Sequence, residues 1–168
     1  VIALKCDLSR VITFMLDNEE NSSLLINHGG ISSPEDIGHH GDSHYTETGG
    51  QYGSSTRYKR DHMLLYNQWQ TGKLAYLIQA LKNTADLDGS ALFDHSMILY
   101  GCWMGDSNNH SRDNVCTIVA GKANGLLTPG RVLRYNNVPR ENLLLTLLRK
   151  WGLNTPSLGF STGVLTDI

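Results

Sequence analysis

The sequence has few charged residues, and none of its apolar runs is long. Asp, Glu, Lys and Arg make up 18% of the 168 residues, and 14 basic against 16 acidic side chains leave a net charge of −2. A nucleic-acid-binding surface needs clustered positive charge to neutralise phosphates, so this balance excludes that class of protein. The apolar runs fall far short of the roughly 20 residues that a membrane-spanning helix needs, so the sequence predicts no transmembrane segment.

Cysteine is also scarce. Cys6, Cys102 and Cys116 form no Cys-x-x-Cys pair and are odd in number, so no disulfide framework is predicted. Cys6 and Cys116 stand among apolar residues, which predicts buried, unreactive thiols. Cys102 lies in a polar segment and is a weak candidate nucleophile, because no histidine with an orienting partner is evident beside it. The chain also lacks the glycine-rich and Walker motifs of phosphate-binding loops.

Glycine and histidine are plentiful, with 17 and seven residues gathered in polar segments. Four histidines lie in residues 17–56, which show hardly any apolar periodicity and predict a long irregular loop. A loop of about forty residues is more often functional or covered by a partner than idle. The low charge, with Asn and Ser supplying polarity, favours a periplasmic or extracellular location. Val1 is not a methionine, so we expect a piece of a longer polypeptide.

Apolar patterning predicts six regular elements. They are buried strands at 10–16, 96–100 and 115–120, an edge strand at 131–135, and helices at 58–83 and 139–151. Continuous apolar strands separated by helices or long loops are typical of a sheet that is buried on both faces. We therefore predict an α/β fold with a mostly parallel sheet covered by helices on both faces. Residues 1–168 would form a single domain, or the C-terminal part of a larger one.

The helix predicted at 58–83 carries an apolar stripe that we expect to face the core. Its members are Leu65, Trp69, Gly72, Tyr76 and Ala80, which recur at helical spacing. Asp61 and His62 lie in its first turns, where an acidic residue favours the helix dipole and His62 is expected to be exposed.

Two polar loops follow predicted strands and are the candidate site. In open α/β sheets, ligands collect beyond the carboxyl ends of the strands. The loops at 38–44 and 104–110 offer imidazoles and carboxylates from His39, His40, His44, His110, Asp42 and Asp106. Such mixed donors suit zinc, manganese or iron. The alternative is that these residues bond to local backbone, with Asp42 and Asp106 forming Asx turns.

Several stretches resemble a known bacterial family. Residues 96–114, SMILYGCWMGDSNNHSRDN, combine a hydrophobic strand with a Met-Gly-Asp-x-Asn-x-His run. The other matching stretches, given in chain order, are 7–16, the His39-His40-Gly41 triplet, 74–77, 130–135, 142–148 and the Gly-Phe-Ser-Thr-Gly run at 159–163. Together they resemble the domain of unknown function numbered fifteen fifty-two, which is placed near the alkaline-phosphatase-like superfamily. The resemblance implies a larger, exported α/β sandwich of which this chain is the C-terminal half.

The resemblance also implies a chemistry. Enzymes of that superfamily hydrolyse phosphate or sulfate esters with two metal ions held by Asp and His. The candidate metal ligands here are His39, His40, Asp106 and His110, with zinc or manganese as the cofactor, or no cofactor. Arg112 stands where the family often has a second histidine, and a guanidinium cannot bind a metal ion. We assign Arg112 instead to an anionic group of the substrate.

Two functions follow as expectations. The first is an exported, alkaline-phosphatase-like, metal-dependent hydrolase of phosphate or sulfate esters, whose nucleophile lies outside this chain. The second is a non-catalytic scaffold or accessory subunit of a larger extracytoplasmic complex, in which the loop at 17–56 packs on a partner chain or on the remainder of the polypeptide.

Overall fold

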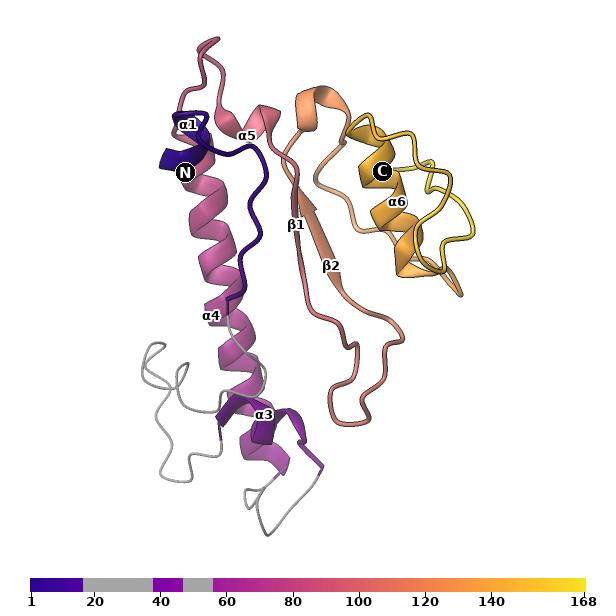
Figure 1. Ribbon diagram of the computed structural model, residues 1–168. Helices are drawn as coiled ribbons and strands as arrows, with labels where there is room; N and C mark the ends of the chain where they lie inside the picture. Colours follow the sequence, from indigo (N-terminus) through magenta and orange to yellow (C-terminus); the bar gives the residue numbers. More distant parts are fainter. Residues whose placement is uncertain (17–37, 47–55) are drawn as a thin grey trace. The chain divides into compact units, whose positions relative to one another are not determined.

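The structure is a computed structural model that describes residues 1–16, 38–46 and 56–168 (Figure 1). Its described elements mix helices with a small sheet, which confirms the α/β class. The chain divides into two compact units, residues 1–80 with 101–116 and residues 81–100 with 117–168. The assignment of a single domain stays a prediction.

The first unit is mainly helical. It contains the short helices α1 (Ile2–Lys5) and α3 (Gly38–Ser43) and most of the long helix α4 (Thr56–Lys82). The long helix confirms the prediction from apolar spacing. Most of the predicted loop at 17–56 lies outside the described residues, and its part at 38–43 is helical.

The face of α4 that is buried differs from the predicted stripe. Tyr76 is 76% exposed and Leu65 is 43% exposed, so the stripe was wrong at these positions. Tyr66 is fully buried instead, with Met63 and Trp69 packed against it. The prediction assumed that only apolar residues face the core, whereas α4 also buries the polar residues Lys59 and His62.

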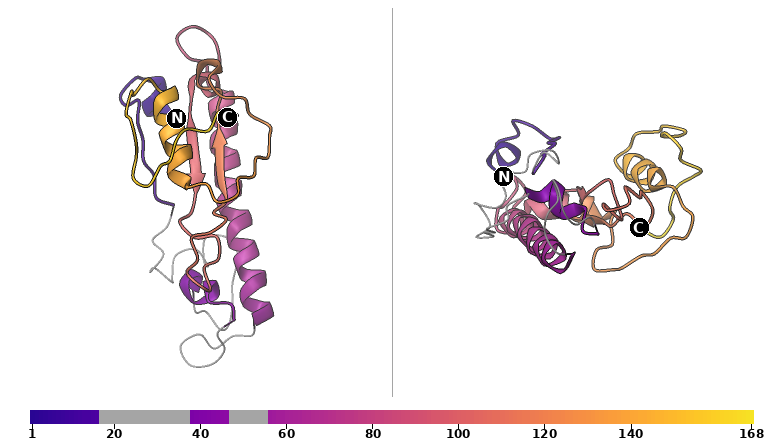
Figure 2. Two further views of the ribbon diagram at one scale, coloured as in Figure 1. Left: turned by 90° about the vertical axis from the view of Figure 1, so that its right-hand side faces the viewer. Right: turned by 90° about the horizontal axis from the view of Figure 1, so that it is seen from below.

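The second unit is built on a hairpin. Strands β1 (Ile98–Gly101) and β2 (Thr117–Ala120) form a two-stranded antiparallel sheet, with the last residue of β1 assigned to the first unit. Helix α6 (Arg140–Lys150) lies against this hairpin, as both views in Figure 2 show. The short helices α5 (Leu92–His95) and η2 (Ala123–Gly125) contact one another. The strands predicted at 96–100 and 115–120 and the helix predicted at 139–151 form, with slightly different bounds. The strands are not fully buried as predicted, because Leu99 and Ile118 are exposed.

Two predicted strands do not form. Residues 10–16 belong to no strand, and Phe14 is 81% exposed. Residues 131–135 likewise belong to no strand, and Val132 is exposed. β-branched and aromatic composition favours a strand only where a neighbouring strand supplies pairing and cover. Among the described residues neither segment has such a neighbour.

The apolar core of the second unit lies between α6 and the hairpin. Buried Ala123, Leu127 and Leu147 pack together with the partly buried Met97, Val119, Leu143 and Ile168. A two-stranded hairpin is at best marginally stable in water alone, so this packing is what stabilises β1 and β2. In the described part of the chain no helix is both long and apolar enough to span a bilayer.

Candidate functional site

The two histidine-bearing segments meet in the first unit. Tyr45 Oη donates to Asp106 Oδ1 at 3.1 Å, and Thr46 N donates to Asn108 Oδ1 at 2.9 Å. Ser107 Oγ donates to the carbonyl oxygen of residue 43 at 3.1 Å. These bonds join residues more than sixty positions apart in the chain, so they confirm that the two loops converge.

Three imidazoles lie in a row at this junction, and we call His40, His44 and His110 the histidine cluster. The ring centroids of His40 and His44 are 5.2 Å apart, and those of His44 and His110 are 5.0 Å apart. His44 is buried, whereas His110 is exposed and reaches the cluster from a backbone φ of 51°. The cluster therefore offers both a buried and a solvent-facing imidazole to a ligand.

His39 faces a different neighbour. Its ring meets the Tyr66 ring edge-on at 5.3 Å, which is the geometry expected for an aromatic contact. Adjacent residues point apart, so of the pair His39 and His40 only His40 belongs to the histidine cluster.

Asp106 organises its own loop. Its Oδ1 accepts from the Asn108 backbone N–H at 3.0 Å, which confirms the predicted Asx turn, and its Oδ2 accepts from Asn109 Nδ2 at 2.7 Å. The bond from Asn109, with that from Tyr45, lowers the pKa of the Asp106 carboxyl. The same Asp106 bond raises the pKa of Tyr45.

Gly105, which precedes this turn, lies where there is no room for a side chain. A Cβ at this position would lie 1.8 Å from the carbonyl oxygen of Asp113, which belongs to the returning half of the loop. Backbone bonds between Asp106 and Ser111 close the turn. The Met-Gly-Asp run thus has a steric reason for its glycine.

Asp42 and His62 form a buried pair, which corrects the prediction for His62. His62 Nδ1 lies 3.1 Å from Asp42 Oδ2, and both side chains are more than nine-tenths buried. His62, which the sequence predicts to be exposed, is 7% exposed and lies against Asp42. Lys59, also fully buried, donates from Nζ to the His44 carbonyl oxygen at 3.0 Å. No sequence pattern indicates this use, because a buried lysine and a surface lysine look alike in composition.

The prediction that the thiols of Cys6 and Cys116 are buried is wrong. Cys6 and Cys116 are exposed, as is Cys102. The short apolar runs around Cys6 and Cys116 lie on exposed segments and not in a core. Cys102 Sγ contacts the Met104 carbonyl oxygen at 3.0 Å.

The donor chemistry suits zinc or manganese, but the described residues do not complete a ligand set. Within 1–16, 38–46 and 56–168 no three side chains of His, Cys, Asp or Glu converge as a metal site would require. Both carboxylate oxygens of Asp106 already accept hydrogen bonds inside the protein. Arg112 is exposed two residues after His110. The metal assignment to His39, His40, Asp106 and His110 stays a prediction.

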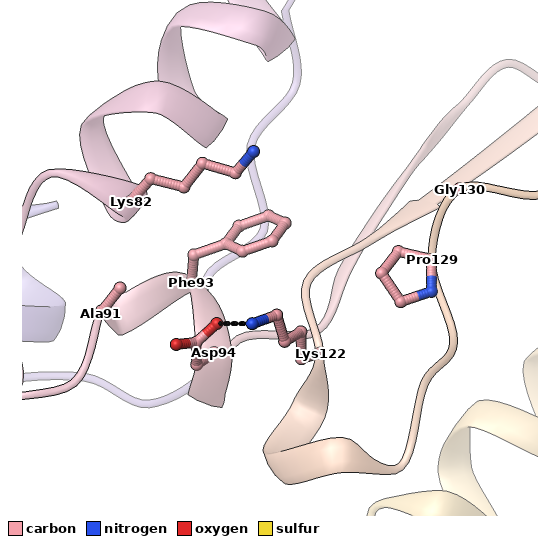
Figure 3. Close-up of a pocket in the computed structure, with 7 residues that line it drawn as sticks. All are labelled: Lys82, Ala91, Phe93, Asp94, Lys122, Pro129 and Gly130. Atoms are coloured by element: carbon pink, nitrogen blue, oxygen red, sulfur yellow. Dashed lines mark ion pairs between the residues drawn. The ribbon is translucent and has the colours of Figure 1, made fainter.

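A separate cavity of about 520 Å³ opens in the second unit. Figure 3 shows its lining residues, Lys82, Ala91, Phe93, Asp94, Lys122, Pro129 and Gly130. Lys122 is paired with Asp94 at 2.8 Å, and the Lys82 ammonium lies 5.0 Å from the centre of the Phe93 ring. Both cations of the cavity thus have partners within its own wall.

Comparison with known proteins finds no matching family model, no matching curated protein and no matching solved structure. The family likeness of the residue stretches therefore stays a resemblance.

Proposed function

We propose that the chain is the C-terminal part of an exported, bacterial, alkaline-phosphatase-like hydrolase of phosphate or sulfate esters. One observation carries the proposal: two segments sixty residues apart bring the imidazoles of the histidine cluster to within about 5 Å of one another. The mostly parallel, doubly covered sheet of that fold class belongs to the same proposal. The described strands supply only an antiparallel pair.

The roles of the residues follow from their surroundings. His110, which is exposed, would act as the general acid or base toward the reacting ester. His44 lies beside it and would hold an oxygen of the anionic group. Arg112 would pair with that group through its planar guanidinium. The metal ions of such enzymes need more ligands than the described residues bring together, so no step here depends on them.

Hydrolysis of p-nitrophenyl phosphate and p-nitrophenyl sulfate by the intact protein, with metal content measured in parallel, tests the proposal. His110→Ala should lower kcat by about 100-fold or more, as loss of a general acid–base group does. Arg112→Met should mainly raise KM. His95→Gln, outside the histidine cluster, is the matched control and should leave both constants unchanged. Equal rates for His110→Ala and His95→Gln would contradict the proposal.

The exposed apolar residues of the first unit favour a second candidate, a non-catalytic accessory subunit. Leu8, Val11, Phe14 and Met15 are all at least 66% exposed on one extended stretch. Single exposed apolar residues are ordinary, but several in succession mark a surface that another chain covers. This candidate predicts a stable complex that Phe14→Ser weakens and no esterase activity, whereas the hydrolase predicts activity without such a partner.

A further inference from the structure

The first turns of helix α4, in the first unit, bury polar side chains. Lys59, His62 and Tyr66 follow one another at spacings of three and four residues, which places them on one side of the helix. Their exposed fractions are 0%, 7% and 0%. Burial of a lysine and a histidine is costly unless hydrogen bonds compensate for the lost water, so a helix that buries both has a specific use for them.

That face binds the segment carrying two of the clustered histidines. His62 Nδ1 contacts Asp42 Oδ2 at 3.1 Å, and Lys59 Nζ donates to the carbonyl oxygen of His44 at 3.0 Å. The two bonds lie on either side of Ser43, and each joins α4 to the histidine-bearing segment. Low solvent exposure strengthens both, since charge-assisted bonds gain most where water is excluded.

Helix α3 depends on these bonds. A helix of six residues does not persist by itself in water, because the cost of nucleation exceeds the gain from its few internal bonds. It also contains two glycines, Gly38 and Gly41, which disfavour helix further. The orientation of His40 and His44 is therefore set by what α3 is bonded to.

The opposite side of the segment meets the loop that bears His110. Tyr45 and Thr46 bond to Asp106 and Asn108, as described above. Asp42 and the His44 carbonyl thus attach the segment to α4. Its last two described residues, Tyr45 and Thr46, attach it to the loop that bears His110. With both attachments in place, the centre of the His44 ring lies 5.0 Å from that of the His110 ring.

We infer that Lys59 and the Asp42–His62 pair are positioning residues of the candidate site. They fix α3 on α4 so that His44 faces His110, and they take no part in the chemistry. The role assigned to the cluster rests on the proposed hydrolysis, but the positioning itself is a geometric claim that can be measured without it.

The test is NMR of the intact protein with labelled histidine side chains. The wild type should show a nuclear Overhauser effect between the His44 and His110 rings. His62→Ala should abolish it while the far-ultraviolet helix signal is kept, and His62→Asn should restore it. Asparagine places an amide nitrogen near the position of Nδ1, so rescue separates the hydrogen bond from mere volume. Gln68→Ala, an exposed change on the same helix, is the control and should keep the effect.

A second variant tests the inference even if His62→Ala does not fold. Lys59→Met keeps a similar volume and removes the bond to the His44 carbonyl, so it should weaken the His44–His110 effect even if His62→Ala does not fold. An unchanged effect in Lys59→Met and in a folded His62→Ala would overturn the inference. Should the wild type show the ring contact, and His62→Asn rescue it, while neither ester is hydrolysed, the positioning stands and the proposed hydrolysis fails. If the esters are hydrolysed and His62→Ala changes neither the rate nor the ring contact, the positioning inference fails and the proposed hydrolysis stands.

Discussion

Single polar side chains hold the C-terminal residues to helix α6. Asn142 Oδ1 accepts from the Thr162 backbone N–H at 2.8 Å, and Asn142 Nδ2 donates to Thr162 Oγ1 at 3.1 Å. Thr146 Oγ1 accepts from the Leu165 backbone N–H at 2.7 Å and donates to the Asn142 carbonyl oxygen. Asn142 and Thr146 are buried, so a leucine-rich helix uses two polar residues to fix a segment without regular structure.

Replacement of Thr146 by valine tests this attachment. The change keeps the shape and leaves the Leu165 N–H unpaired, so we expect a loss of about 1–2 kcal/mol in the free energy of unfolding. Urea titration followed by circular dichroism measures it. Thr71→Val, at an exposed position of α4, should change stability by less than about 0.5 kcal/mol. Equal losses in the two variants would contradict the role of Thr146.

His95 predicts a pH dependence. Its Nδ1 bonds to Asn124 Oδ1 and its Nε2 lies 3.3 Å from Asp88 Oδ2. The bond to Asn124, followed by the charges of Asp88 and Asp86, raises the pKa of His95. A raised pKa in the folded state means that the protonated form stabilises the fold. This stabilisation is complete below the usual pKa of about 6.5 and is lost as pH rises through the raised value.

Unfolding midpoints in urea between about pH 5 and pH 8 measure this effect. The wild type should lose stability toward the upper end of the range. His95→Gln should lose less, because it removes the titrating group. If both proteins show the same slope, His95 does not supply the dependence.

At the scale of the element, the end of strand β2 is fixed by close backbone contact. Gly121 follows β2 with a φ of 94°, and a Cβ there would lie 2.0 Å from the carbonyl oxygen of Ser96. The Ala123 N–H donates to the same carbonyl at 3.0 Å. The chain can therefore turn from β2 into η2 only where a residue has no side chain.

Gly130 offers a matched comparison for Gly121. Its φ is 83°, but nothing lies within 4 Å of an added Cβ. Gly130→Ala should cost about 1–2 kcal/mol, the price of left-handed backbone for an L-residue. Gly121→Ala should cost at least twice as much, because the backbone must also move away from Ser96. Chemical denaturation of the two variants measures the difference, and similar losses would show that the contact is not close.

At the scale of the whole molecule, the chain passes between its two compact units three times. The boundaries fall after Ala80, Tyr100 and Cys116. Helix α4 continues across the first of these boundaries without a break, and β1 runs to the second. Because regular elements continue from one unit into the next, unfolding of one unit should disrupt the other.

We therefore expect a single cooperative unfolding transition, as the single-domain prediction requires. Trp69 and Trp103 lie in the first unit and Trp151 lies in the second. Fluorescence of Trp151→Phe reports the first unit, and fluorescence of the double variant Trp69→Phe, Trp103→Phe reports the second. The two midpoints should coincide once each is referred to the circular dichroism midpoint of its own variant. Separate midpoints would make the units independent domains.

The sequence by itself determined the features that depend on neighbours along the chain. Apolar spacing predicted α4 and α6, and short apolar runs predicted strands at 96–100 and 115–120, where β1 and β2 form at 98–101 and 117–120. Local patterning suffices there because helix formation and turn geometry are set within a few residues. The same reasoning placed the candidate site on two polar loops, and those loops do meet.

Only the tertiary structure decided which side chains are buried and which partners they have. The segments at 10–16 and 131–135 have strand-like composition but gain no pairing strand among the described residues. His62 pairs with Asp42 twenty positions away, Lys59 with the His44 carbonyl fifteen away, and Tyr45 with Asp106 sixty-one away. A contact between residues distant in sequence leaves no local periodicity, so the use of buried polar side chains to orient the histidines becomes visible only once the chain has folded.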